Sequence, residues 1–212
     1  MVTILHADND IAVCIKPAGV LSQDAGETSM PAQLRRQLQT DSVHVVHRLD
    51  REVGGVMVFA LNQTAAAVLS RSVQDRTLEK TYRAVLHGVP GQQEAVLEDL
   101  LFHDKNRNKT YIVDRIRKGV KDARLDYRLL QTSDSHALVE IHLHTGRTHQ
   151  IRVQFASRKL PLVGDRKYGG KDPGKPLCLW SYQLSFPHPA TGAAMTFTQP
   201  APWEQEWINW FT

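Results

Sequence analysis

The sequence predicts a mixed α/β (α+β) fold, with a mixed and mostly antiparallel central sheet flanked by helices. Short apolar runs with strand alternation recur along the whole chain, and turn residues such as Asn9-Asp10 separate neighbouring runs. Only three segments show the spacing of an amphipathic helix. A chain of 212 residues, 42% of them hydrophobic, can bury a sizeable core, so we expect a single domain over residues 1–212.

Strands are predicted where apolar or β-branched residues alternate with polar ones, or form a short run between turns. In residues 139–144, for example, Val139, Ile141 and Leu143 fall on one face of the chain. The predicted strands cover residues 3–5, 11–15, 43–46, 56–61, 78–88, 95–101, 111–113, 125–130, 137–144, 177–186 and 195–198.

Capping residues and apolar spacing predict helices over residues 29–40, 65–76 and 149–157. Thr28 or Ser29 caps the first, which has Pro31 in its first turn, where proline is tolerated. Asn62 or Thr64 caps the second. The buried side of the second helix is expected to carry Ala67, Leu69 and Val73.

The two cysteines, Cys14 and Cys178, lie in apolar runs, so we expect buried free thiols. No apolar run approaches the ~20 residues that a membrane helix needs, and the N-terminal residues lack the pattern of a signal peptide. These observations predict a cytoplasmic protein that does not bind membranes.

Positive charge is concentrated in one stretch. Residues 104–124 contain eight Lys/Arg and three Asp, a net charge of +5, whereas the remainder of the chain has a net charge of −1. Such a concentration indicates a phosphate-contact surface, although a solvated hairpin with basic tips has the same composition.

A polar insert, His47-Arg48-Leu49-Asp50-Arg51-Glu52, lies between the predicted strands 43–46 and 56–61 and is followed by Val53-Gly54-Gly55. The layout holds charged residues on a loop between two anchored strands, an arrangement often used for functional groups. An Asp between two Arg is also typical of a weak surface ion pair.

The tetrapeptide His47-Arg48-Leu49-Asp50 resembles the signature of the RluA-type pseudouridine synthases, in which the Asp is the catalytic nucleophile. Where that family usually has Thr-Ser-Gly, this chain has Val53-Gly54-Gly55, so only the last Gly agrees. Three further motifs resemble those of the family and occur along the chain in the family's order. They are Lys16-Pro17-Ala18-Gly19, Lys80-Thr81-Tyr82, and Thr145-Gly146-Arg147-Thr148-His149-Gln150-Ile151-Arg152. The later segment Gly164-Asp165-Arg166-Lys167-Tyr168-Gly169-Gly170 resembles the family at the family's spacing.

The resemblance implies a pseudouridine synthase fold, with a cleft across the sheet where the Asp50 loop meets the Arg152 helix. Asp50 is then the nucleophile, attacking the uracil ring or the ribose C1′. Arg152 is its partner, since an opposite charge nearby favours the ionised form of a carboxyl and a guanidinium can bind it with two bonds. Tyr82 would stack on the base and serve as general base at the sugar.

The resemblance also implies a set of substrate-binding residues. Ile151 would pack on the uracil, and Arg48 would fill the space of a flipped-out base or contact the backbone. The substrate-binding residues expected from the motifs are Arg48, Lys80, Arg147, His149 and Ile151. The reaction involves no net oxidation or hydrolysis, so no cofactor and no metal are expected.

The sequence therefore predicts a monomeric, cofactor-free enzyme that isomerises uridines in stem-loops of rRNA or tRNA. The family's frequent N-terminal S4 domain is not expected, because the motifs begin at Lys16. The alternatives are an inactive RNA-binding or ribosome-assembly module of the same fold, and a hydrolase using Asp50 with a histidine. A zinc site is a further alternative, built from the histidines that share a strand face or lie close in sequence: His44, His47, His142, His144 and His149.

Overall fold

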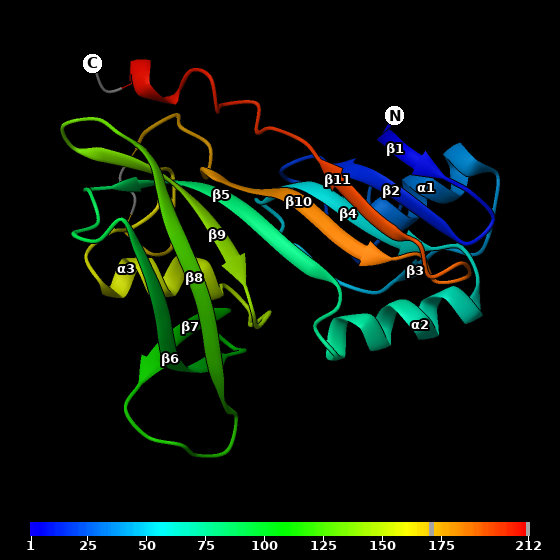
Figure 1. The fold of residues 1–212 in the computed structure, drawn as a ribbon, viewed down its shortest axis with the longest axis horizontal. Coiled ribbons are helices and arrows are strands. Elements are labelled where there is room, and N and C mark those ends of the chain that lie inside the picture. Colours follow the sequence, from blue (N-terminus) through cyan, green and yellow to red (C-terminus); the bar gives the residue numbers. More distant parts are fainter. Residues whose placement is uncertain (170–171, 211–212) are drawn as a thin grey trace. The chain divides into compact units, whose positions relative to one another are not determined.

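The structure, a computed structural model, describes residues 1–169 and 172–210 and confirms the mixed α+β class (Figure 1). The chain divides into two compact units. The first comprises Met1–Lys80 with Trp180–Ala201, and the second comprises Thr81–Leu179 with Pro202–Thr212. Each unit contains part of the predicted site, and the single domain over residues 1–212 stays a prediction.

The sheet of the first unit is built around β4 (Gly54–Ala60), which is buried along its whole length. β2 (Ile11–Lys16) pairs antiparallel with β4, and β10 (Leu179–Pro187) pairs parallel with it. The remaining strands are β1 (Thr3–Ala7), β3 (His44–Val45) and β11 (Ala194–Thr198), which pair antiparallel with β2, β4 and β10. Continuous apolar strands such as β2 and β4 are typical of strands covered on both faces.

Gly55 is required for the close approach of β4 to β10. Its φ of +122° favours glycine, and a Cβ there would lie 2.3 Å from the carbonyl oxygen of Ser181. Gly55 therefore does more than end the Asp50 loop. It also allows the backbone of β4 to lie against the backbone of β10.

Two helices belong to the first unit: α1 (Met30–Leu38) and α2 (Gln63–Gln74). The predicted burial of Ala67 is wrong. Ala67 is exposed, and α2 packs on β4 through Ala65, Ala66 and Leu69 (Figure 1). At 100° per residue, Ala67 lies about 200° from Ala65 and Leu69, so these two and Ala67 cannot share a face.

Asn62 is the N-cap of α2, since its Oδ1 accepts a hydrogen bond of 2.8 Å from the backbone N of Ala65. We expect Asn62→Ala to lower the free energy of unfolding by ~1 kcal/mol, because the helix loses a partner for a terminal N–H. Thr64→Ala, at the second helical position of the same first turn, should change the free energy of unfolding by less than ~0.5 kcal/mol. Urea denaturation of both variants measures the difference, and equal effects would remove the assignment of Asn62 as the cap.

The sheet of the second unit is antiparallel throughout. Its order is β5 (Glu79–His87), β9 (His136–Leu143), β8 (Val120–Thr132), β6 (Glu94–Asp104) and β7 (Lys109–Val113). The helix α3 (Gln150–Ser157) contacts β6 and β7, and β8 extends to the loop 114–119 that joins it to β7 (Figure 1). The short 3-10 helix Trp207–Trp210 ends the described chain.

All eleven predicted strands are confirmed, although residues 43–46 form only the two-residue strand β3. Cys14 and Cys178 are buried free thiols, as predicted, and burial raises the pKa of each to about 12. Within the described residues, every helix is too short or too polar to cross a membrane.

Candidate active site

Asp50 lies in the loop between β3 and β4 of the first unit, and hydrogen bonds from distant residues hold this loop. Ser22 Oγ donates to the carbonyl of Leu49 at 2.9 Å and accepts from its backbone N at 3.3 Å. Gly19 N donates to the carbonyl of Arg51 at 2.7 Å, and Arg51 Nε donates back to the carbonyl of Gly19 at 3.0 Å. The loop is therefore fixed on both sides of Asp50.

Lys16 also supports the Asp50 loop. The sequence did not predict it as a site residue. Its side chain is fully buried, and Nζ donates to the carbonyls of Pro17 at 2.9 Å and Arg51 at 3.0 Å. Burial lowers the pKa of Lys16 to about 8, while the negative charge of Asp50 acts in the opposite direction. The motif Lys16-Pro17-Ala18-Gly19 was the available signal, and its role is to hold the Asp50 loop.

His47 fastens the start of this loop to β4. It is buried, and its Nε2 accepts a hydrogen bond of 3.2 Å from the backbone N of Val58. Burial, assisted by the positive charge of Lys80, holds the pKa of His47 well below its usual value. Lys80 lies nearby, and burial lowers its pKa to about 8. Arg48, by contrast, is exposed and donates to Gln23 Oε1 at 2.8 Å.

Arg152, on α3 of the second unit, forms a buried two-bonded ion pair with Asp165. Arg152 Nε and Nη2 donate to Oδ2 and Oδ1 of Asp165, each at 2.8 Å, and the two side chains are 3% and 0% exposed. Asp165 Oδ1 also accepts from the backbone N of Lys167 at 3.1 Å and of Tyr168 at 3.2 Å. Sequence reasoning missed Asp165, and the Gly-Asp-x-x-Tyr-Gly segment was the signal for it.

The Tyr168 ring packs against the guanidinium of Arg152. The guanidinium carbon lies 5.3 Å from the centre of the ring. The Tyr168 hydroxyl accepts from the backbone N of Thr110 at 2.7 Å and bonds Nδ1 of His149 at 2.9 Å. Burial raises the pKa of Tyr168. His149, predicted to bind substrate, is buried here as the residue that precedes α3.

The other predicted residues of the second unit lie on β5 and at the start of α3. Tyr82 is buried on β5 opposite Ile141, and Ile151 is buried in the first turn of α3. Arg147 is half-buried, with its Nε donating to the carbonyl of Asp122 at 2.8 Å. Gly170, the last residue of the Gly164–Gly170 motif, lies outside the described residues.

The histidines proposed as zinc ligands have separate partners. His142 Nδ1 lies 3.2 Å from Thr81 Oγ1, and His144 Nε2 bonds Asp126. In the part of the chain that the structure describes, the one group with ligand-like spacing is Asp8, Asp10 and His188. There, Nδ1 of His188 accepts from two backbone N–H groups, so Nε2 carries the proton and donates to Asp8. This group is therefore a hydrogen-bonded cluster rather than a set of metal ligands.

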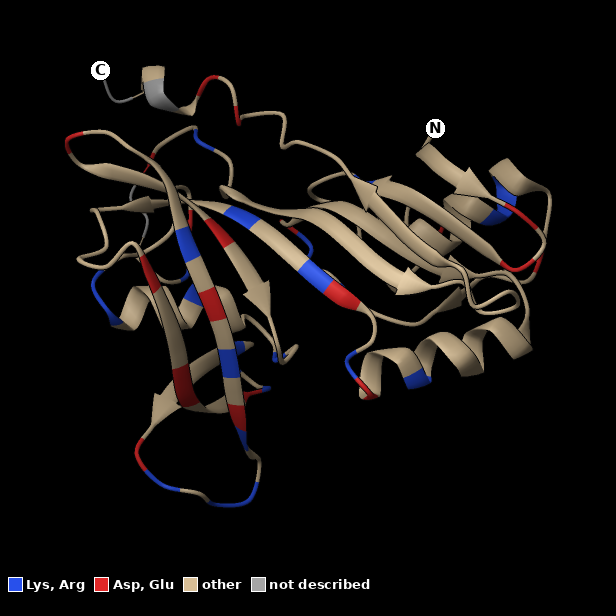
Figure 2. Ribbon diagram, in the orientation of Figure 1, with Lys and Arg blue, Asp and Glu red and all other residues tan. Residues whose placement is uncertain are grey.

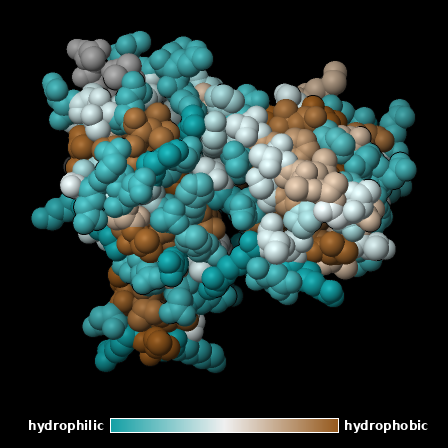
Figure 3. Space-filling model, viewed as in Figure 1, coloured by the Kyte–Doolittle hydropathy of each residue, from teal (hydrophilic) through white to brown (hydrophobic). Residues whose placement is uncertain are grey.

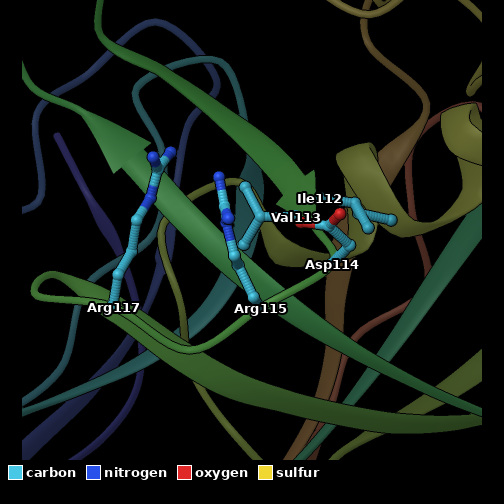
Figure 4. A pocket seen from close by; sticks show the side chains of 5 residues that line it. All are labelled: Ile112, Val113, Asp114, Arg115 and Arg117. Carbon is cyan, nitrogen blue, oxygen red and sulfur yellow. The ribbon is translucent and has the colours of Figure 1, made fainter.

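The loop 114–119, which holds Arg115, Arg117 and Lys118 of the basic stretch 104–124, forms the tip of the second unit (Figure 2). An open depression of about 470 Å³ is lined by Ile112, Val113, Asp114, Arg115 and Arg117, with the two arginines side by side (Figure 4). Between them Ile116 is 78% exposed, and hydrophobic atoms adjoin hydrophilic ones over this tip (Figure 3). Arg117 lies over the ring of Phe102, with 5.2 Å between its guanidinium carbon and the ring centre.

The predicted site residues thus form two sets. The first unit carries Arg48, Asp50 and Lys80, and the second carries Tyr82, Arg147, His149, Ile151 and Arg152. Hydrogen bonds hold the Asp50 loop in the first set, and Arg152 and His149 in the second. That the two sets join in one site stays a prediction.

Comparison with known proteins agrees with the motifs. The family model for RNA pseudouridylate synthase matches residues 10–157. An uncharacterized RNA pseudouridine synthase of Aquifex aeolicus is 35% identical over 224 residues, covering 95% of this chain and 70% of the relative. A ribosomal large subunit pseudouridine synthase D of Neisseria meningitidis is 32% identical over 219 residues, covering 94% of this chain and 58% of the relative.

Solved structures show the same fold. Human RNA pseudouridylate synthase domain containing 1 has a TM-score of 0.81 and 24% identity, over 96% of this chain and 84% of the human one. Human RNA pseudouridylate synthase domain containing 4 has a TM-score of 0.78 and 25% identity, over 98% and 90%.

Proposed function

This chain belongs to the RNA pseudouridylate synthase family, and we propose that it isomerises specific uridines of rRNA or tRNA with Asp50 as the nucleophile. Pseudouridine synthases are isomerases. The observation that carries the assignment of Asp50 is its place in a loop fixed on both sides by the 16–19 turn and Ser22. Such fixation holds a reacting carboxylate in one geometry, which is a main source of catalytic rate.

In the proposed reaction the bond between uracil N1 and ribose C1′ breaks, the base turns, and a bond forms between its C5 and C1′. The proton on C5 is lost and N1 gains one, so atoms and electrons balance without an oxidant. A carboxylate nucleophile divides this difficult exchange into two easier steps. Asp50 attacks C1′ or the uracil ring, Arg152 binds the carboxylate of Asp50, and Tyr82 stacks on the base and acts as general base at the sugar.

The remaining predicted residues grip the uridine and its neighbours. Ile151 packs on the uracil, and Arg48, the exposed member of the Asp50 loop, contacts the RNA where the base leaves the stack. Lys80, Arg147 and His149 are the other residues proposed to bind the substrate. His149 acts in part through Tyr168, since its Nδ1 bonds the Tyr168 hydroxyl.

The basic tip at residues 114–119 is proposed to bind the phosphate backbone. Arg115 and Arg117 extend side by side from the loop, an arrangement in which both guanidinium groups can contact phosphates (Figure 4). Binding should weaken as salt rises, because each phosphate contact releases counterions.

We expect the double variant Arg115→Ala/Arg117→Ala to reduce the slope of log affinity against log salt by ~0.7–0.9 for each phosphate contact removed. Filter binding of a labelled stem-loop at several salt concentrations measures the slope. Arg71→Ala is the control, since Arg71 is an exposed arginine on α2 outside the tip. An unchanged slope in the double variant would show that Arg115 and Arg117 do not contact the RNA backbone.

The proposed function is tested by mapping pseudouridine in total RNA from cells with and without the gene. Loss of one or a few sites in rRNA or tRNA is the expected result. The rRNA is examined first because three of the relatives are named ribosomal large subunit pseudouridine synthase D. Unchanged maps would favour the inactive RNA-binding or ribosome-assembly module.

The proposal also includes a cytoplasmic location and a monomeric state. Light scattering of the purified protein measures the oligomeric state.

A further inference from the structure

We propose that Asp165 is a positioning residue for the isomerisation, which fixes the guanidinium of Arg152 so that its other end can bind the catalytic carboxylate. The inference rests on the proposed function. Its geometric basis is the fork of two 2.8 Å bonds from Nε and Nη2 of Arg152 to the Asp165 carboxylate. An arginine has five N–H donors in a rigid plane, so this fork uses one edge and leaves the end that carries Nη1 outside it.

The fork defines where the guanidinium points because Asp165 is itself fixed. Its Oδ1 accepts from the backbone N of Lys167 and of Tyr168, which closes a tight turn around the carboxylate. The preceding Gly164 has φ +73°, and a Cβ there would lie 1.9 Å from the carbonyl oxygen of Pro176. The turn therefore has little room to shift.

The face of the guanidinium is fixed as well as its edge. The Tyr168 ring lies against it, and the Tyr168 hydroxyl is held by Thr110 and His149. Edge and face contacts together leave the side chain one orientation.

The electrostatics of the Asp165–Arg152 pair favour a role for Asp165 in positioning Arg152 over a role in stabilising the fold alone. Buried ion pairs contribute little net stability compared with apolar residues of similar volume, so stability alone gives weak reason for this pair. Because the Asp165 charge offsets the Arg152 charge, the pair as a unit is neutral. Arg152 is then a directed donor of hydrogen bonds, and its direction decides how well it binds a carboxylate.

The test compares Asp165→Asn with a matched Asp→Asn variant whose carboxylate also pairs with an arginine, the one at the C-cap of α3. Asp165→Asn keeps the size of the side chain and an oxygen for the turn but loses the charged fork. We expect kcat to fall ~10–100-fold, since displacement of a reacting group by about 1 Å costs on the order of 10²-fold. KM for the RNA should stay within about twofold. The control is Asp99→Asn, which breaks the ion pair of Asp99 with Arg158 at the other end of α3 and should leave kcat unchanged.

A double-variant cycle separates positioning from folding. If Asp165 acts only through Arg152, then Asp165→Asn should not lower kcat further in an Arg152→Met background. An equal loss in both backgrounds would show that Asp165 matters for folding alone and would overturn the inference. Circular dichroism at the assay temperature confirms that each variant compared is folded.

A measurement that does not depend on catalysis tests the two hydrogen bonds between Arg152 and Asp165 directly. Side-chain ¹⁵N NMR should show a slowly exchanging Nε–H of Arg152 in the wild-type protein, absent from Asp165→Asn. If wild-type protein makes no pseudouridine in any RNA, the proposed function fails and the inference fails with it. If wild type is active and Asp165→Asn has wild-type kcat, or if the Nε–H signal survives, only the inference fails.

Discussion

Replacing Asp50 with alanine is expected to abolish pseudouridine formation while leaving RNA affinity nearly intact. Loss of a nucleophile costs on the order of 10⁴-fold or more in turnover, because neither covalent step can occur without it. Binding depends mainly on phosphate contacts and base stacking elsewhere, so the dissociation constant should change by less than about threefold.

Single-turnover assays with purified protein and a target transcript measure this loss, and filter binding measures affinity. Asp50→Asn, nearly the same size, should be as inactive as Asp50→Ala. Asp41→Asn, an exposed carboxylate of the same unit, should be fully active. Wild-type turnover in Asp50→Ala would show that another group is the nucleophile.

Replacing Arg152 with methionine is expected to lower the free energy of unfolding by ~3–5 kcal/mol, because Asp165 remains as an unpaired charge in the interior. The control is Arg158→Met at the C-cap of the same helix. Arg158 pairs with Asp99 at 2.9 Å, but its side chain is 33% exposed, so its loss should cost only about 0–1 kcal/mol.

The double variant Arg152→Met/Asp165→Asn should recover a large part of the stability lost in Arg152→Met, since no unpaired charge then remains. Urea denaturation of the four proteins measures these differences. A cost below about 1 kcal/mol for Arg152→Met would contradict the buried pair described here.

The strands could be predicted because their signal is local. Apolar alternation and turn residues lie within a few positions of each other, as in residues 139–144, and do not depend on distant partners. The face of α2 was predicted less well. Ala67 is apolar but exposed, and alanine carries too little hydrophobic surface to tell a buried face from an exposed one.

The site could be predicted only where a motif marked it. Asp50 and Arg152 stood in recognisable motifs. Lys16 and Asp165, which hold them, stood in motifs too, but Ser22 stood in none. Ser22 lies 27 positions before Leu49, and Asp165 lies 13 positions after Arg152. Hydrogen bonds across such separations leave no periodic pattern in the sequence. The motifs therefore marked Lys16 and Asp165 without giving their bonding partners, and Ser22 was identified only from the structure.

Release of tritium from RNA labelled at uridine C5 is the most direct test of the proposed chemistry, since a new bond at C5 must displace its hydrogen. Purified wild-type protein, with no added cofactor, should release tritium from rRNA or tRNA transcripts, and Asp50→Asn should release none. Absence of release by the wild-type protein from every RNA tested, or equal release by the two proteins, would contradict the account.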